Sequence, residues 1–247
     1  MKQTVTDAGS ILKRYYSHLL KQLGPQGWWP GRTRLEIILG AILTQNTSWT
    51  NAALALQQLR QRRLLTLARL RAVSATELEA NIRTAGFFRQ KARTIRTFIK
   101  WLSAEYGGSL RAMFARPAAE LRSELLRLSG LGPETVDAIL LYAGRQPFFV
   151  ADGYTRRILA RHELVPAGIS YPALQQFIQQ ELPADHLLFN EFHALLVAVG
   201  KHWCKRRQPR CNDCVLREFL PAASQAVATR AGYPGRVAAP AIQLQRR

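Results

Sequence analysis

Three cysteines form the first group of residues whose type and spacing suggest chemistry. Cys204, Cys211 and Cys214 lie within eleven residues and are the only cysteines in the 247-residue sequence. An odd, clustered set of cysteines argues against a disulfide framework. The N-terminal segment lacks the apolar region of a secretory signal, which argues in the same direction. The cluster favours ligation of a metal ion or an iron–sulfur cluster.

The segment Leu128–Leu140 predicts a tight helical hairpin. A leucine-rich helix ends at Gly130, and Gly132 precedes Pro133, a residue suited to the first position of a new helix. Two glycines one residue apart let the backbone turn tightly and approach a ligand closely. The N–H groups at the start of the second helix then point outward, with the positive end of the helix dipole behind them. The segment predicts a phosphate-binding turn, although an ordinary helix–helix turn has the same pattern.

The charge balance indicates the kind of partner. The chain has 35 Lys and Arg against 16 Asp and Glu, a formal net charge of +19, which points to a polyanion and most simply to nucleic acid. Charge alone does not separate nucleic acid from an anionic membrane surface or an acidic protein.

The longest run without charge, residues 37–59, contains several polar residues and is too polar to span a membrane. A hydrophobic content of 47% excludes a disordered chain.

The spacing of apolar residues predicts which elements position the cysteines and the hairpin. Leucines recur at three- and four-residue spacing, alternating runs of strand length are scarce, and the one strand candidate is Pro147–Val150. The sequence therefore predicts an all-α protein.

Residues 221–247 contain no acidic side chain and are expected to form a poorly ordered basic tail, either a solvated extension or a tether to DNA.

Basic residues concentrate between Arg60 and Lys100. Such a run is either a solvated face or a surface that faces phosphates. Five of these residues wind around one predicted helix: Arg89, Lys91, Arg93, Arg96 and Lys100.

The order of these motifs resembles the endonuclease III-like family of helix–hairpin–helix DNA glycosylases, and within it the branch that includes a 3-methyladenine DNA glycosylase. The resemblance extends from about Trp28 to Cys214. The matching segments are Trp28-Trp29-Pro30, Gly40–Thr47, Gly86–Ala92, the Gly130–Pro133 hairpin, Val150-Ala151-Asp152 and the cysteine cluster. The resemblance implies two helical domains with a central cleft that holds a flipped base. The implied divisions are a helical barrel with the hairpin at 34–146, a second domain with the cysteine loop at 1–33 and 147–220, and the tail at 221–247.

The resemblance also implies an activity, base-excision repair by a DNA glycosylase. The expected partner is damaged double-stranded DNA, and the protein is expected to act as a monomer in the cytoplasm, at the nucleoid. Cleavage of an N-glycosidic bond develops positive charge on the deoxyribose, which a fixed carboxylate can stabilise while it orients or deprotonates water. Asp152 matches the family's catalytic aspartate. From the residues alone, a helix N-cap is the simpler role for Asp152.

The position after the hairpin proline distinguishes two mechanisms. Bifunctional members of the family carry a lysine two residues after the second glycine, and its amine attacks C1′ to form a Schiff base. Glu134 occupies that position here. Because a carboxylate cannot form a Schiff base, we expect a monofunctional glycosylase that releases the base with water. Weak lyase activity would require a lysine from elsewhere.

Three further positions match the family's base pocket. Trp29, Pro30 and Trp49 match residues that line it, where aromatic faces attract a cationic base; packing in a core is the alternative role for tryptophan. Gln45 matches the residue that fills the gap left by the flipped nucleotide, and its amide can bond to the orphaned base. A surface glutamine at a helix end has the same pattern.

Two departures bear on the substrate. The adenine-specific branch uses a glutamate general acid at the position of Gly40. An alkylated purine needs no such acid, because its base is already cationic and leaves readily. An alkylated purine is therefore the expected lesion. The 3-methyladenine branch has a pocket lysine where this chain has Leu195, which leaves the choice of lesion open.

The cysteine loop departs from the family's pattern Cys-x6-Cys-x2-Cys-x5-Cys at its last position. Cys204, Cys211 and Cys214 match the first three positions, and the fourth is Leu220. Three interpretations stay open. The loop holds a [4Fe–4S] cluster with three thiolates and an outside ligand, or it has lost its cluster and remains a basic DNA contact, or it binds zinc through three thiolates with His202 or water.

Two other functions remain as alternatives. The first is a bifunctional endonuclease III-type DNA glycosylase/AP lyase that acts on oxidised pyrimidines. The second is a non-catalytic DNA-binding protein that uses the hairpin alone. Borohydride trapping on lesion DNA tests the first alternative, and base release by an Asp152→Asn variant tests the second.

Overall fold

The fold is helical throughout the described part of the chain. The structure, a computed structural model, describes residues 8–29 and 31–221, and within these ranges it contains helices and no β-strand. The prediction of an all-α protein is confirmed. Pro30 and the predicted tail beyond Pro221 lie outside the described residues. Within the described ranges, no helix combines the length and apolarity that crossing a bilayer requires.

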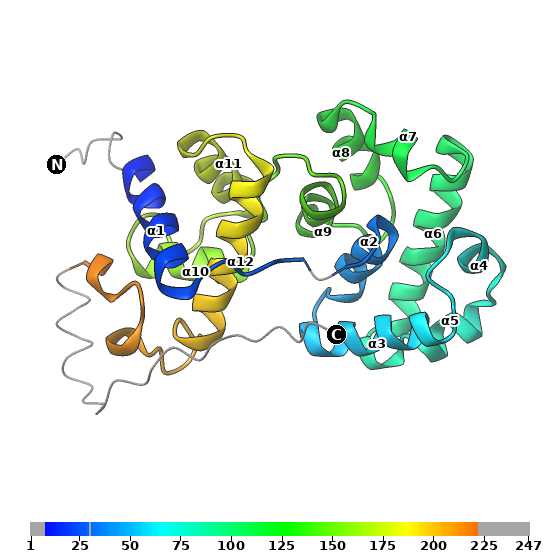
Figure 1. The fold of residues 1–247 in the computed structure, drawn as a ribbon, viewed down its shortest axis with the longest axis horizontal. Coiled ribbons are helices and arrows are strands. Elements are labelled where there is room, and N and C mark those ends of the chain that lie inside the picture. Colours follow the sequence, from blue (N-terminus) through cyan, green and yellow to red (C-terminus); the bar gives the residue numbers. More distant parts are fainter. Residues whose placement is uncertain (1–7, 30, 222–247) are drawn as a thin grey trace. The chain divides into compact units, whose positions relative to one another are not determined.

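The chain divides into two compact units, shown in Figure 1. One, which we call the hairpin unit, is Trp29–Pro147. The other, which we call the terminal unit, combines Met1–Trp28 with Phe148–Arg247.

The hairpin unit is built around one apolar helix. Its helices are α2 (Arg34–Leu43), α3 (Trp49–Gln61), α4 (Leu67–Ala72), α5 (Ala75–Asn81), the 3₁₀ turn Arg83–Ala85, α6 (Phe88–Tyr106), α7 (Leu110–Phe114), α8 (Ala118–Leu126), α9 (Pro133–Ala138) and the π-helix Ile139–Ala143. Eight of the ten residues of α2 are buried. A helix that is apolar on nearly every side belongs inside a core, and α2 packs against α3, α6, α9 and the π-helix.

Local signals set the boundaries of these helices. The Thr33 hydroxyl accepts a hydrogen bond from the N–H of Glu36 at the start of α2, and Ser48 caps α3 in the same way. The longest helix, α6, ends at Gly107, whose φ of 57° makes it a left-handed C-cap. α6 begins after Gly86 and Phe87, which both have positive φ.

The terminal unit is also helical within the described residues. It contains α1 (Ala8–Leu23), α10 (Gly153–Arg161), α11 (Tyr171–Glu181), α12 (His186–His202) and the 3₁₀ turns Cys211–Asp213 and Arg217–Phe219. The apolar helix α12 packs against α10 and α1, and α1 also packs against α11. Phe189 and Phe192 of α12 are fully buried.

The one strand candidate, Pro147–Val150, has no strand partner. It has no regular secondary structure and leads to α10. Two side-chain amides of α11 replace the partner: Gln179 Oε1 accepts from the N–H of Phe149 at 2.8 Å, and Gln175 Nε2 donates to the Phe149 carbonyl at 2.7 Å. The segment directly before Asp152 is therefore fixed by side chains, because a buried backbone needs partners of some kind.

Candidate active site

The predicted hairpin is present between α8 and α9. Gly130 has a φ of 90°, a conformation that favours glycine, and Pro133 is the first residue of α9. A Cβ atom at Gly130 would lie 2.0 Å from Thr94 Oγ1, so the hairpin packs directly on α6. Glu134 lies in the first turn of α9, where an acid complements the helix dipole.

Gln45 is held by the hairpin. Its Nε2 donates to the Gly130 carbonyl at 3.0 Å and to Thr135 Oγ1 at 2.8 Å. The amide predicted to enter the duplex therefore lies next to the turn predicted to hold a phosphate. This contact agrees with a surface glutamine at a helix end. For Gln45 to fill the gap left by a flipped nucleotide, its amide would first have to leave the hairpin.

Lys91 differs from the expectation for its basic run. The basic run predicts Lys91 on a surface that is solvated or faces phosphate, but Lys91 is only 2% exposed. Its Nζ donates to the carbonyls of Leu43 at 2.9 Å and Ala85 at 2.7 Å. Burial lowers the pKa of Lys91 to about 8. A buried ammonium thus joins the end of α2 to the 3₁₀ turn that precedes α6.

Phe87 is a residue whose role the sequence did not predict. Its side chain is 66% exposed, and its φ of 46° is unusual for a bulky residue. Each carbonyl bound by Lys91 lies two residues before a side chain at a turn. Leu43 precedes Gln45 in this way, and Ala85 precedes Phe87. The glycine before Phe87 is a signal for a turn, but no sequence pattern shows that the aromatic ring is exposed.

The predicted base pocket contains an aromatic cluster within the hairpin unit. Trp29 lies edge-on to Trp49 with centroids 4.8 Å apart, and it lies 5.0 Å from Tyr142, tilted by 30°. Neither tryptophan is fully buried. Tyr142 of the π-helix was not predicted, because an aromatic residue in an apolar run has the pattern of a core residue. Pro30, the third predicted pocket residue, lies outside the described residues.

Gly40 lets the Trp29 ring of this cluster pack closely against α2. A Cβ atom there would lie 3.1 Å from Cζ2 and Nε1 of Trp29 and 3.4 Å from a methyl group of Leu56. The indole therefore lies against the backbone of α2, where any longer side chain at position 40 would have to displace it. Leu195, the other position compared with the family, is fully buried in α12 of the terminal unit.

Asp152 is the N-cap of α10 and also faces a histidine. Its Oδ1 accepts from the N–H of Thr155 at 2.8 Å, and its Oδ2 lies 3.4 Å from Nε2 of His193 on α12. The Asp152 side chain is 11% exposed. Burial by itself raises the pKa of Asp152, but the charge and hydrogen bond of His193 and the bonds from Thr155 outweigh it, and the pKa is lowered.

The surroundings of Asp152 were predicted only in part. The cap is the role that the residue type suggested, whereas His193 was not singled out because it lies in an apolar helix far along the chain. Lys201, also on α12, lies with its Nζ 5.6 Å from the centre of the Trp28 ring. Burial lowers the pKa of Lys201, and the charge of Asp152 opposes that effect.

Arginine side chains hold the start of the cysteine loop. Arg161 Nη1 donates to Cys204 Sγ at 2.8 Å, and Arg157 Nε donates to the Cys204 carbonyl at 2.6 Å. Both arginines come from α10, one turn apart, so the helix that Asp152 caps also fixes this loop. Arg210, in the same loop, lies 3.0 Å from Asp213.

The cysteine loop does not fit a four-thiolate cluster. The fourth position is Leu220, an apolar side chain that is 5% exposed. Burial raises the pKa of Cys211, and it raises the pKa of Cys214 to about 12. Within the described ranges, no group of three or more His, Cys, Asp or Glu side chains has the arrangement of a metal site.

Comparison with known proteins places this arrangement in a family. The chain matches the model of the HhH-GPD superfamily base excision DNA repair proteins over residues 39–184. It is 37% identical over 210 residues to a Methanocaldococcus jannaschii protein assigned as a DNA repair glycosylase, covering 85% of this chain and 95% of the relative.

Solved structures share the fold. An endonuclease III trapped as a covalent intermediate with DNA has a TM-score of 0.75 at 21% identity, covering 89% of this chain and 98% of that one. The H. pylori 3-methyladenine DNA glycosylase bound to 1,N6-ethenoadenine has a TM-score of 0.66 at 26% identity, covering 77% and 95%. The chain belongs to the HhH-GPD superfamily of base excision DNA repair proteins and is a DNA glycosylase of that superfamily.

Proposed function

We propose that this protein is a monofunctional DNA glycosylase that uses water to release alkylated purines from double-stranded DNA. The observation that carries the proposal is Glu134 in the first turn of α9. Bifunctional members of the endonuclease III-like family have a lysine at this position. Glutamate has no amine to attack C1′. The step is a hydrolysis: a C1′–oxygen bond forms from water, the C1′–nitrogen bond breaks, and its electron pair leaves with the base.

Asp152 is the carboxylate assigned to this step. Both of its oxygens have neighbours, one at Thr155 N–H and the other at His193. A carboxylate fixed on both sides needs little reorganisation when positive charge develops on the sugar, and a lowered pKa keeps it ionised. These contacts favour electrostatic stabilisation and orientation of water as its main contribution. The proton released by water passes to the carboxylate or to solvent.

The aromatic cluster supports the choice of substrate. Trp29, Trp49 and Tyr142 pack together as an aromatic cluster, which in this proposal receives the flat base. A cationic base gains most from contact with aromatic rings. Because Trp29 occupies the space beside Gly40, a glutamate general acid has no room there without a rearrangement. A base that leaves without protonation is therefore the suitable substrate. The H. pylori relative with 26% identity is bound to a modified purine, which supports the same class.

Entry into the duplex is assigned to Gln45 and Phe87. Phe87 presents an exposed ring from a turn with positive φ, and such strained, exposed residues are typical of functional sites. Lys91 links the backbone before both residues. In this proposal the ring and the amide occupy the space from which the damaged nucleotide is flipped.

One observation favours a second candidate, a weak lyase activity. Lys201 has a lowered pKa, and an amine with a lowered pKa is the more reactive nucleophile in Schiff-base chemistry. In that case a borohydride-trapped adduct would form in the wild type and disappear in a Lys201→Ala variant. No step in either candidate passes through an iron–sulfur cluster.

The test is a single-turnover base-release assay on duplexes that each contain one lesion. The panel contains a cationic methylated purine, a neutral modified purine and an oxidised pyrimidine. We expect the cationic purine to be released fastest and Asp152→Asn to reduce its release by about 100-fold or more. Asparagine still caps α10, so helix content should not change.

Glu134→Gln is the matched control. It changes a carboxylate to an amide at the hairpin, and base release should stay near the wild-type rate. The proposal fails if no lesion is released, or if Asp152→Asn releases the base as fast as the wild type. A borohydride adduct that persists in the Lys201→Ala variant would contradict the water mechanism.

A further inference from the structure

A stripe of basic side chains runs along one face of α6, beside the hairpin. Arg93, Arg96 and Lys100 are exposed and follow one another at three- and four-residue spacing, so they share a face of the helix. Two adjoining hollows of about 590 and 600 Å³ flank this stripe and share Arg96 and Thr97. The stripe thus borders two neighbouring hollows, which together we call the α6 groove.

The other basic residues of α6 do not contribute to the groove. Lys91 is buried with its Nζ bonded to two carbonyls. Arg89 lies 3.9 Å from Glu79, and its guanidinium covers the Phe88 ring at 5.2 Å. The basic run predicts one surface for all of these residues, whereas the structure separates three that line the two hollows from two that do not.

The hairpin forms one end of the groove. Ser129 and Gly130 line the same hollow as Arg93 and Arg96. The contact between Gly130 and Thr94 leaves no space for a side chain, so the hairpin lies directly on α6. Arg71 lines the other hollow together with Lys100. The groove therefore starts at the turn that is suited to hold a phosphate and continues along α6 toward α4.

The chemistry of the groove suits phosphodiester oxygens. Arg96 is held in place by a hydrogen bond from its Nη1 to the Val73 carbonyl at 3.0 Å, and its other N–H groups remain for a ligand. Thr97 and Ser129 add hydroxyl donors. None of the described residues that line the two hollows is acidic.

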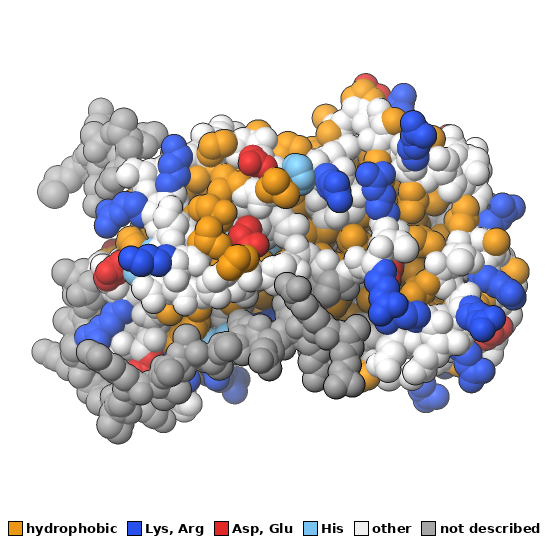
Figure 2. Space-filling view, viewed as in Figure 1, with side chains coloured by type: hydrophobic (Ala, Val, Ile, Leu, Met, Phe, Trp, Pro, Cys, Tyr) orange, Lys and Arg blue, Asp and Glu red, His pale blue; other side chains and the backbone are white. Residues whose placement is uncertain are grey.

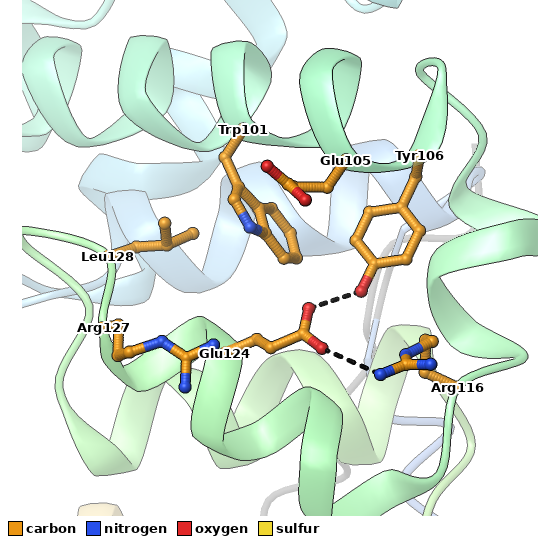
Figure 3. A pocket seen from close by; sticks show the side chains of 7 residues that line it. All are labelled: Trp101, Glu105, Tyr106, Arg116, Glu124, Arg127 and Leu128. Atoms are coloured by element: carbon orange, nitrogen blue, oxygen red, sulfur yellow. Dashed lines mark hydrogen bonds and ion pairs between the residues drawn. The ribbon is translucent and has the colours of Figure 1, made fainter.

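A third hollow in the same unit shows the contrast. It measures about 580 Å³ and includes Arg116 and Arg127, but Glu105 and Glu124 also line it. Glu124 is bound by Tyr106 and Arg116, as Figure 3 shows. Carboxylates in this hollow oppose the binding of phosphate. Figure 2 shows basic side chains spread widely over one face of the molecule, with fewer acidic ones, so the groove is distinguished by its shape and lining rather than by charge alone.

We propose that this α6 groove binds the sugar–phosphate backbone of duplex DNA beyond the phosphate held by the hairpin. The inference rests on the proposed function for its partner, DNA, but it assigns a binding surface rather than a catalytic role. Contacts to phosphates carry no sequence information. The groove should therefore increase affinity for damaged and undamaged duplexes alike.

The test is the salt dependence of binding to an undamaged duplex, measured by fluorescence anisotropy. The variant Arg93→Gln/Lys100→Gln removes two charges from the groove and keeps Arg96 on Val73. Each lost phosphate contact lowers the slope of log affinity against log salt by about 0.9, so the slope should become shallower by about 2. The matched control, Arg62→Gln/Arg111→Gln, removes two exposed charges of the same unit that do not line the groove. The control should keep the wild-type slope.

Single-turnover base release at saturating enzyme separates this inference from the proposed function. The groove variant should release the base at the wild-type rate once bound, whereas Asp152→Asn should bind normally and release slowly. An unchanged slope in the groove variant would overturn the inference, as would an equal change in the control, which would indicate diffuse attraction by the whole basic surface. Neither result depends on whether any lesion is released.

Discussion

The buried Lys91 makes the stability of this protein depend on pH in an unusual range. Its Nζ donates to the carbonyls of Leu43 and Ala85 from a side chain that is 2% exposed, and burial lowers its pKa from 10.5 to about 8. Below pH 8 the lysine is protonated in both the folded and the unfolded chain, so the cost of burying the charge is fully present.

The direction of the effect follows from the lowered pKa. Between about pH 8 and 10.5 the folded chain loses this proton while the unfolded chain keeps it. The unfolded state then binds more protons, and the free energy of unfolding rises with pH. The difference between 10.5 and about 8, at about 1.4 kcal/mol for each unit, amounts to roughly 3 kcal/mol. Above pH 10.5 the gain levels off.

Other groups oppose this gain, so a variant is needed to isolate it. Burial raises the pKa values of Tyr106 and Cys214, each to about 12, and folding stability that depends on their protonated forms is lost as pH rises above their ordinary values of 10.0 and 9.0. The variant Lys91→Met keeps a flexible apolar side chain and removes the titrating amine. The contributions of Tyr106 and Cys214 are the same in both proteins, so they cancel in the difference between the two free energies of unfolding.

The assay is equilibrium unfolding in urea at intervals from pH 7 to 10.5, followed by helical circular dichroism. The wild type should gain about 3 kcal/mol relative to Lys91→Met across this range. Lys100→Met, on the exposed face of the same helix, should follow the wild type at every pH. A difference between wild type and Lys91→Met that stays constant with pH would refute the reasoning, since it would mean that the folded lysine titrates near its ordinary value.

Three further predictions concern the site. His193→Gln should shift the acidic limb of the single-turnover pH–rate profile to higher pH. His193 lowers the pKa of Asp152, so without it the carboxylate is protonated sooner as pH falls. An unmoved limb would exclude an influence of His193 on Asp152. Gly40→Ala should slow base release without weakening binding to undamaged duplex, since its Cβ meets Trp29 at 3.1 Å; equal losses of binding and release would instead indicate a general disturbance of the fold. Leu220→Cys completes the cysteine spacing and should increase the iron per chain and the visible absorbance of freshly purified protein; iron content equal to that of the wild type would show that the fourth thiolate is not what limits the cluster.

Much of the fold followed from local patterns. Leucine periodicity predicted a helical chain, and the pair Gly130 and Gly132 with Pro133 predicted the hairpin, because each of these signals acts within a few residues. The cap at Asp152 belongs to the same class, since a side chain that bonds three residues ahead needs no distant partner.

The parts that sequence reasoning missed depend on distant contacts. His193 lies opposite Asp152 across 41 positions of the sequence, and Gln175 and Gln179 support Phe149 from another helix. Periodicity shows that a residue lies on an apolar face but not what it meets there. Lys91 is the clearest error, because a lysine within a basic run has the pattern of a solvated residue, whereas here two carbonyls hold its ammonium group inside the core.

The cysteine loop illustrates how a fold can keep a segment in place when a motif is incomplete. In a four-thiolate site the metal cluster joins the loop to itself and to the rest of its domain. Here Arg157 and Arg161 of α10 reach the carbonyl and the Sγ of Cys204. These bonds attach the start of the loop to the helix that begins at Asp152, and they need no metal. Because Asp152 caps that helix through Thr155 N–H, the geometry of the carboxylate and that of the loop are coupled through one helix. The absence of a cysteine at position 220 is therefore compatible with an intact cap at Asp152.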